Sequence, residues 1–315
     1  MDKIVALAGG VGGAKLVHGL SQCLTPEQLV TIVNIGDDFN HLGLRICPDL
    51  DTVCYTLAGK ANLATGWGRA GETWNALESL GEIGGPTWFR LGDLDLGTHL
   101  ERTRRLRSGE PLSKITKDFC CSWEVEFTVL PASDDNVPTW VYTEEGELPF
   151  QEYFVHRQCL PKVSGFRFAD VEAAKPAPGV LEALGDARLV IICPSNPWVS
   201  IGPILEIPGI QEAVACRTVI AVSPIIGGEA VKGPAAKMYK ELGIQPSAQA
   251  VAQQYGSLLT GYVIDLVDKG QEEALRHAGL EVLTVDTLMK TNADRHRLAK
   301  QVLDFGEQVF DRKNK

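Results

Sequence analysis

The chain opens its first predicted strand with Lys3-Ile4-Val5-Ala6-Leu7-Ala8 and runs directly into Gly9-Gly10-Val11-Gly12-Gly13-Ala14-Lys15-Leu16. An apolar run that ends in glycines and leads into a helical pattern is typical of the first strand–loop–helix unit of an α/β sheet. The run is too short for the core of a signal peptide or for a membrane span. We therefore predict a strand over residues 3–8 and an α/β fold.

Further apolar runs bounded by glycine or proline alternate with stretches of helical period along the chain. This alternation predicts βαβ units and a mostly parallel sheet with helices on both faces. The other predicted strands are 29–35, 87–91, 188–193, 218–222 and 261–266. The predicted helices are 14–23, 50–57, 72–80, 98–107, 210–215, 234–242 and 294–310.

The middle of the chain, residues 120–174, has a different pattern. Segments 124–130 and 139–143 alternate polar with apolar residues, as half-solvated antiparallel strands do, and a turn-rich stretch separates them. We interpret residues 120–174 as an inserted, smaller β-rich subdomain. The nucleotide-binding core is then discontinuous and comprises residues 1–119 and 175–315.

The charge balance and the cysteines narrow the class of protein. The 315 residues include 30 Lys and Arg against 40 Asp and Glu, a formal net charge of −10, and no strongly basic run occurs. This balance disfavours a nucleic acid or an anionic membrane as partner. The eight cysteines are scattered without C-x-x-C spacing, which indicates reduced thiols in a cytoplasmic protein.

The glycine loop after the first strand is a candidate phosphate site. Backbone N–H groups of Gly10, Val11, Gly12 and Gly13, at the positive end of a helix, are suited to a diphosphate, and Lys15 adds a charge. The loop is no Walker A motif, because Leu16 stands where a magnesium-binding Ser or Thr is needed, and Lys15 occupies the third glycine position of a dinucleotide fingerprint. A tight turn without function is the alternative.

Carboxylates follow two predicted strands. Asp37 and Asp38 come after strand 29–35, and Asp49 and Asp51 follow closely at the start of a helix. Ligands bind beyond the carboxyl ends of the strands in open α/β sheets, so Asp49 and Asp51 are predicted to act together, one as general base and the other as ligand of a hard cation. Helix capping is the alternative.

A second acidic pair, Asp93 and Asp95, follows predicted strand 87–91. His99 lies four residues beyond Asp95 and is a further site candidate, whereas His18 in the first helix is assigned to packing.

Two late loops carry small polar residues between prolines. They follow strands 188–193 and 218–222, where rigid turns with hydroxyl and amide groups are suited to a nucleotide. Ordinary turn chemistry is the alternative. The candidate binding residues in these loops are Ser195, Asn196, Ser200, Gly202, Ser223 and Gly227.

Together these motifs resemble the 2-phospho-L-lactate transferase family of coenzyme F-420 biosynthesis. The likeness is carried by residues 9–16, 48–53, 91–95, 194–203 and 222–228, and it spans almost the full chain. It implies a Rossmann-like core and a homodimer. It also implies a magnesium-dependent (Mg²⁺) transfer of a phospholactyl-type group, carrying 2-phospholactate, phosphoenolpyruvate or phosphoglycerate, from a guanosine diphosphate-linked donor to the deazaflavin Fo, with release of GMP.

The resemblance also assigns roles to residues. The family's deazaflavin-contacting acid matches Asp51. Arg90 stands where the family often has lysine, which keeps the charge but changes the geometry at the donor. We expect Asp49 and Asp51 to position the magnesium ion, and one of Trp67, Trp74 or Trp88 to stack on the deazaflavin unless all three belong to the core.

Two other functions fit part of the pattern. A nucleotide-sugar-binding regulator of related fold would share the glycine loop and the late loops but would have no need for Asp49, Asp51, Asp93 and Asp95 in one pocket. An NAD-dependent oxidoreductase is disfavoured by Lys15 at the third glycine position.

Overall fold

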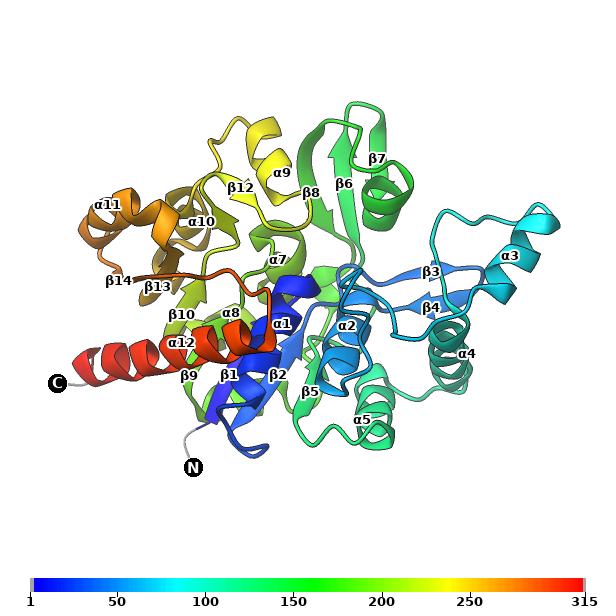
Figure 1. Cartoon of the computed structure of the whole chain (residues 1–315), viewed down its shortest axis with the longest axis horizontal. Coiled ribbons are helices and arrows are strands. Elements are labelled where there is room, and N and C mark those ends of the chain that lie inside the picture. Colours follow the sequence, from blue (N-terminus) through cyan, green and yellow to red (C-terminus); the bar gives the residue numbers. More distant parts are fainter. Residues whose placement is uncertain (1–2, 314–315) are drawn as a thin grey trace.

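A seven-stranded parallel sheet forms the centre of the molecule (Figure 1). The structure is a computed structural model that describes residues 3–313. The strand order is β14-β13-β10-β9-β1-β2-β5, and every neighbouring pair is parallel. These strands are β1 (Lys3–Ala8), β2 (Leu29–Val33), β5 (Thr128–Pro131), β9 (Ala187–Ile192), β10 (Thr218–Val222), β13 (Gly261–Asp265) and β14 (Glu281–Val285).

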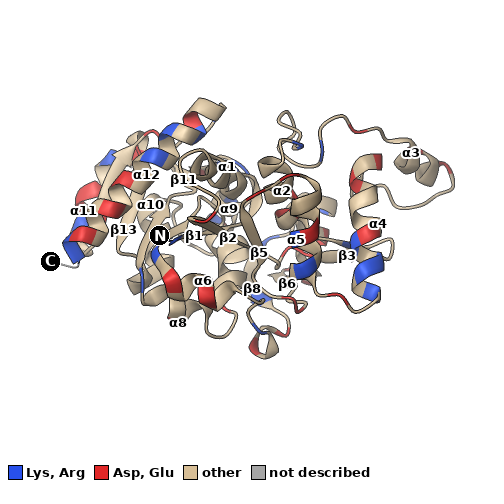
Figure 2. Ribbon diagram, turned by 90° about the horizontal axis from the view of Figure 1, so that it is seen from below, with Lys and Arg blue, Asp and Glu red and all other residues tan. Residues whose placement is uncertain are grey.

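Helices cover both faces of this sheet, as the sequence predicts (Figure 2). Helices α1, α2 and α12 pack together on one face, and α6 and α8 pack together on the other. The helices are α1 (Gly10–Ser21), α2 (Pro48–Leu57), α3 (Asn75–Glu82), α4 (Asp93–Arg107), α5 (Leu112–Ser122), α6 (Val180–Asp186), α7 (Gly202–Leu205), α8 (Ile210–Ala215), α9 (Ala235–Glu241), α10 (Ala248–Tyr255), α11 (Glu272–His277) and α12 (Asn292–Lys313).

The core lies at the middle of the sheet. Strands β2, β10 and β13 are buried along their whole length, and β1 and β9 are buried at all but one residue each. Strands covered by helices on both faces are near-continuous apolar runs, which explains why the sequence predicts these five.

Three smaller antiparallel sheets accompany the main one. Strands β6 (Thr139–Thr143), β7 (Gly146–Pro149) and β8 (Val163–Phe168) form a three-stranded sheet that stands above the main sheet in Figure 1. The two others are the hairpin of β3 (Phe39–His41) and β4 (Leu44–Ile46) and the pair β11 (Ile225–Ile226) and β12 (Glu229–Ala230).

The structure corrects the expectation for segment 124–130. Its strand is β5, which pairs with β2 in parallel at the edge of the main sheet, and not an antiparallel partner of 139–143. The alternation of polar and apolar residues reflects the different burial of the two faces of β5: α5 packs on this strand, Val129 is buried, and Thr128 is exposed. The boundaries 120 and 174 of the inserted subdomain remain a prediction.

The predicted strand over residues 87–91 is wrong. These residues form a loop between α3 and α4. Phe89 packs edge-on against Phe39 at 4.8 Å between ring centroids, and Trp88 packs edge-on against His41 at 5.0 Å. The aromatic residues that suggested a strand thus cover the β3–β4 hairpin.

The described part of the chain contains neither a disulfide nor a membrane-crossing helix. All eight cysteines are free thiols. None of the helices within residues 3–313 combines the length and the apolar character needed to cross a bilayer.

Candidate functional site

The glycine loop joins β1 to α1 and forms the first turn of the helix. α1 begins at Gly10, whose φ of 64° is left-handed and favours glycine. A Cβ on Gly12 would collide with the carbonyl oxygen of Pro194. The first four N–H groups of a helix have no intrahelical acceptor, so the loop offers donors at a place where two backbone segments meet closely.

Ser195 ties the late loop to this turn. Its hydroxyl donates to the carbonyl of Gly9 at 2.7 Å and accepts from the Gly9 N–H at 3.2 Å. Ser200 also lies there, since a Cβ on Gly9 would be 2.7 Å from the Cβ of Ser200. The loop after β9 therefore meets the glycine loop, as the parallel neighbours β1 and β9 require.

Asn34, which sequence reasoning missed, joins the acidic residues to this region. Its side-chain amide lies 2.9 Å from Asp37 Oδ1, 2.9 Å from Asp49 Oδ2 and 3.2 Å from the carbonyl oxygen of Val199. Asn34 directly follows β2, so its position at the carboxyl end of a buried strand was the available signal. We call Asn34, Asp37 and Asp49 the acidic cluster.

The acidic cluster is buried, and burial dominates its electrostatics. Burial raises the pKa of Asp49 to about 6, although the Asn34 amide and the Gly10 N–H, which donates to Asp49 Oδ1 at 2.7 Å, both lower it. Burial, followed by repulsion from Asp49, also raises the pKa of Asp37. Two buried carboxyl groups beside the glycine loop are well suited to a divalent cation.

Asp51 belongs to a different set of contacts. Its carboxylate pairs with both terminal nitrogens of Arg102, which is 3% exposed, and one of these distances is 3.0 Å. Burial acts against the charge of Arg102, but the attraction of Asp51 outweighs it and raises the pKa of the guanidinium. The structure thus separates the two acids that the sequence pairs: Asp49 bonds to Asn34 and Gly10, and Asp51 to Arg102.

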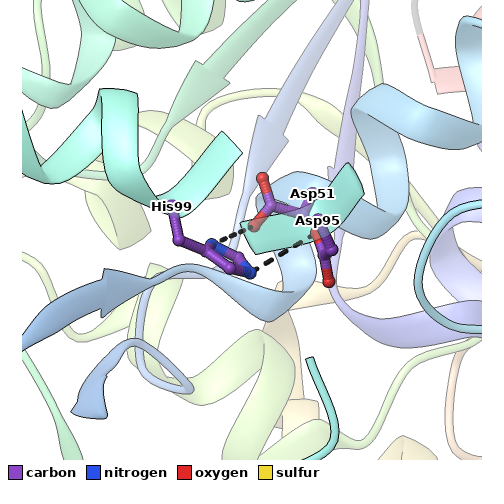
Figure 3. Close-up of side chains that lie close together, drawn as sticks. All are labelled: Asp51, Asp95 and His99. Carbon is purple, nitrogen blue, oxygen red and sulfur yellow. Dashed lines mark ion pairs between the residues drawn. The ribbon is translucent and has the colours of Figure 1, made fainter. Parts of the chain in front are cut away.

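His99 lies between two carboxylates (Figure 3). Its Nδ1 is 3.7 Å from Asp51 Oδ2, and its Nε2 is 3.4 Å from Asp95 Oδ1. Asp95 also accepts from the Tyr55 hydroxyl at 2.7 Å. Burial would raise the pKa of Asp95, but His99 and Tyr55 outweigh burial and lower it.

Asp51, Asp95 and His99 offer ligand atoms within 4.8 Å of one another and form a possible metal-binding triad. This triad includes an imidazole, which suits transition metals more than Mg²⁺. Asp37 and Asp49 offer oxygen atoms only, and the same Asn34 nitrogen contacts both. The donor chemistry of the acidic cluster therefore fits Mg²⁺, with Asp49 as the ligand that the sequence also suggests.

The remaining late-loop candidates mostly support their own turns. The Asn196 side chain caps a π-helical turn, Pro197–Ile201, by accepting from the Trp198 N–H at 3.0 Å. Ser223 donates to the Ile225 carbonyl at 2.9 Å. Gly227, with φ of 58°, donates its N–H to Asp268. Gly202 begins α7 and lies against Phe168.

Arg90 and Asp93 contact the residues at the start of α3, although they follow this helix in sequence. The Arg90 guanidinium lies over the Trp74 ring at 4.4 Å and is exposed. Asp93 is in the first turn of α4 and accepts from the Thr73 hydroxyl and the Ala76 N–H, which lower its pKa to about 2. Asp93 therefore organises the entry to α3.

Comparison with known proteins settles the family. The family described as "2-phospho-L-lactate transferase CofD" matches residues 4–304. The chain belongs to this family. It is 44% identical to a protein of Streptomyces griseus named phosphoenolpyruvate transferase, over 98% of this chain and 99% of the relative. It is 41% identical to a protein of the same name from Mycolicibacterium smegmatis, over 90% and 94%.

Solved structures support the fold. A protein of the UPF0052 family from Bacillus halodurans superposes with a TM-score of 0.63 at 17% identity, covering 96% of this chain and 98% of the other. As a member of the CofD family, the chain is a transferase. This finding sets aside the regulator and the oxidoreductase that the sequence left open.

Proposed function

We propose that the protein transfers a phospholactyl-type group, carrying 2-phospholactate, phosphoenolpyruvate or phosphoglycerate, from a guanosine diphosphate-linked donor to the deazaflavin Fo and releases GMP. The observation that carries the proposal is the contact between the glycine loop and a buried carboxylate, in which the Gly10 N–H donates to Asp49. The turn that we propose binds phosphate is therefore in direct contact with the acid that we propose binds the cation. Both lie beside the carboxyl ends of β1 and β2. Family membership and the names of the relatives point the same way.

The reaction is a displacement at phosphorus. A ribityl hydroxyl of Fo gives its proton to Asp51 as general base and forms a bond to the phosphorus that bears the acyl-type group, and the bond from that phosphorus to the GMP oxygen breaks. Asp51 orients the attacking hydroxyl, and Arg102 holds the Asp51 side chain in place. Asp49, with Asp37 or Asp51, would hold a magnesium ion, and such an ion would supply positive charge against the leaving phosphate.

The other predicted residues complete the donor site. N–H groups of Val11, Gly12 and Gly13 bind the diphosphate, and Ser195 fixes the turn by its two bonds to Gly9. Asn196, Ser200 and the loop that contains Ser223 and Gly227 form the wall against which guanosine lies. We further propose a cytoplasmic homodimer.

Product analysis tests the proposal directly. The protein is mixed with Fo, Mg²⁺ and the three donors in competition, and mass spectrometry identifies the fluorescent product and GMP. We expect one acyl type to dominate, because a difference of about 1–3 kcal/mol in transition-state binding already gives a roughly 10- to 200-fold preference. The proposed reaction is wrong if no Fo-linked product forms with any donor.

The variant Asp51→Asn tests the role of that acid. Because it removes the charge that orients the hydroxyl, we expect kcat to fall by about 10²-fold or more. Asp304→Asn in α12 is the matched control, since Asp304 is exposed and lies outside the site. Full turnover by Asp51→Asn would exclude the role proposed for Asp51.

A further inference from the structure

Three cations around α1 have no carboxylate partner in the part of the chain that the structure describes. The chain has ten more acidic than basic residues, and most of its arginines take part in ion pairs. No ion pair within residues 3–313 involves Lys15, Lys232 or Arg295. We call these three residues the cationic cluster.

Lys232 lies beside the glycine loop. Its ammonium group donates to the Thr65 carbonyl at 3.0 Å. A Cβ built on Gly66 would collide with the Lys232 ammonium and would be 3.3 Å from Cγ1 of Val11. The ammonium, the loop that contains Thr65 and Gly66, and the first turn of α1 therefore meet at one place.

Lys15 and Arg295 continue the cluster along α1. Lys15 is half-buried, and its ammonium donates to the Met289 carbonyl at 2.8 Å, just before α12 begins. Arg295 is in the first turn of α12, and its carbonyl oxygen packs against Gly19 of α1. Burial lowers the pKa of Lys15, and repulsion from Arg295 and Lys232 lowers it further.

Arg295 is the most unusual of the three. It is 6% exposed, and its Nε has no hydrogen-bond partner among the described residues. A buried charge without a partner is costly. A bound anion can supply the missing partner, since guanidinium and ammonium groups recognise phosphate and carboxylate oxygens.

We propose that Lys15, Lys232 and Arg295 form an anion subsite that extends the glycine loop and binds the diphosphate and carboxylate end of the donor. The ligand class is a nucleoside diphosphate or its acyl ester. This inference rests on the proposed function, because it identifies how the same site recognises its donor. It gives the three cations an anionic partner, which no carboxylate within residues 3–313 provides.

Calorimetric titration with GDP and GMP, both commercially obtainable probes, tests the subsite. We expect Lys15→Met and Lys232→Met each to weaken GDP binding by about tenfold, since each loses a charge-assisted bond to phosphate. GMP lacks the second phosphate, so its affinity falls less. The salt dependence of GDP binding becomes shallower in both variants, because fewer charges are neutralised on binding.

Arg295→Met separates a ligand-binding role from a structural one. We expect weaker GDP binding together with an unchanged or higher Tm of the free protein, because the variant removes an unpaired buried charge. A structural arginine would instead lower the Tm and leave the affinity of the folded protein unchanged. Arg295→Lys and Lys232→Arg keep the charge and are expected to restore most of the affinity.

Lys117→Met is the matched control, because Lys117 is an exposed lysine on α5. The subsite is excluded if the three variants bind GDP as Lys117→Met does, or if GDP and GMP lose affinity equally. This outcome differs from failure of the proposed reaction. If no Fo-linked product forms but GDP affinity depends on the cationic cluster, the reaction is wrong and the subsite stands.

Discussion

The charged side chains on the two sides of the glycine loop differ in the partners that the protein gives them. On the side of β2, α2 and α4, the protein itself supplies partners: Asn34 contacts Asp49, and Arg102 pairs with Asp51. On the side of α12, Lys15 and Arg295 have no carboxylate partner among residues 3–313. The Asp51 charge is therefore paired within the protein, whereas in our proposal Lys15 and Arg295 gain an anionic partner only when a ligand binds.

The largest effect is expected on the acidic side, from Arg102→Met. The variant leaves the buried Asp51 carboxylate without its partner, and breaking a buried pair costs about 3–5 kcal/mol of the free energy of unfolding. Urea titration measures this loss. The double variant Asp51→Asn with Arg102→Met is expected to recover part of it, because no unpaired charge remains.

Arg104→Met is the control for this prediction. Arg104 is exposed on the same helix and pairs with Glu101 at 2.8 Å, and such surface pairs contribute about 0.5 kcal/mol. If Arg102→Met and Arg104→Met unfold at the same urea concentration, the Asp51–Arg102 pair does not stabilise the folded protein. The comparison between the two sides of the glycine loop would then be wrong.

The next effect is a pH dependence of stability from Asp38. Burial raises its pKa to about 6, with Arg45 only partly opposing, against about 3.9 in the unfolded chain. Between these values the folded state retains a proton that the unfolded state has released, so stability falls as pH rises through this window, by up to roughly 3 kcal/mol. Asp38→Asn is expected to flatten this part of the stability curve.

Asp93 is expected to change stability with pH in the opposite direction to Asp38. Its pKa is lowered to about 2 by the Thr73 hydroxyl and neighbouring amides, so its contribution is present above the unfolded value and is lost as pH falls toward 2. Unfolding curves for Asp38→Asn and Asp93→Asn from pH 2 to 7 would separate the two windows. Equal changes at all pH values would refute the assignment.

A third prediction concerns the turn between the two sides. Gly12→Ala places a methyl group against the Pro194 carbonyl, and relieving this overlap costs about 1–3 kcal/mol and weakens GDP binding. Gly97→Ala is the matched control, since nothing lies within 4 Å of that position in α4. The control is expected to gain about 0.5–1 kcal/mol in free energy of unfolding. A stable Gly12→Ala variant with normal GDP binding would argue against a close contact between Gly12 and Pro194.

The smallest effect compares two ligands. Pyrophosphate at about ten times its Kd is expected to stabilise the protein by about 1.4 kcal/mol, and the variant lacking both Lys15 and Lys232 loses this response. If Mg²⁺ binds at the acidic cluster as proposed, Asp49→Asn is expected to lose only the response to Mg²⁺. Thermal unfolding measures both responses. Loss of the Mg²⁺ response in the lysine variant, or of the pyrophosphate response in Asp49→Asn, would contradict two separate binding sites.

The sequence predicts the strands that are buried on both faces of the sheet. Strands β1, β2, β9, β10 and β13 are continuous apolar runs because helices cover both faces. The edges are harder: β14 (Glu281-Val282-Leu283-Thr284-Val285) mixes polar with apolar residues and is not predicted. Trp88 and Phe89 resemble a strand by composition, yet their packing partners lie on a hairpin far along the chain.

The site is readable only in part, for a related reason. Asp37 and Ser195 follow the buried strands β2 and β9, and a parallel sheet brings the ends of its strands together. Arg102 lies in the interior of α4 with no local signal, and its contact with Asp51 joins two helices through the tertiary fold. Likewise, sequence spacing does not show that Asp49 and Asp51, two residues apart, face different partners.

The position of β1 between β2 and β9 has a consequence for how the chain folds. The pair β1–β9 joins the first strand to one that begins at Ala187, so the middle of the sheet is closed by residues far apart in sequence. At a synthesis rate of about 5–20 residues per second, β1 waits roughly 10–40 s on the ribosome for its neighbour. During this interval its apolar residues are exposed on one edge, and chaperone binding to the nascent N-terminal third is the expected protection.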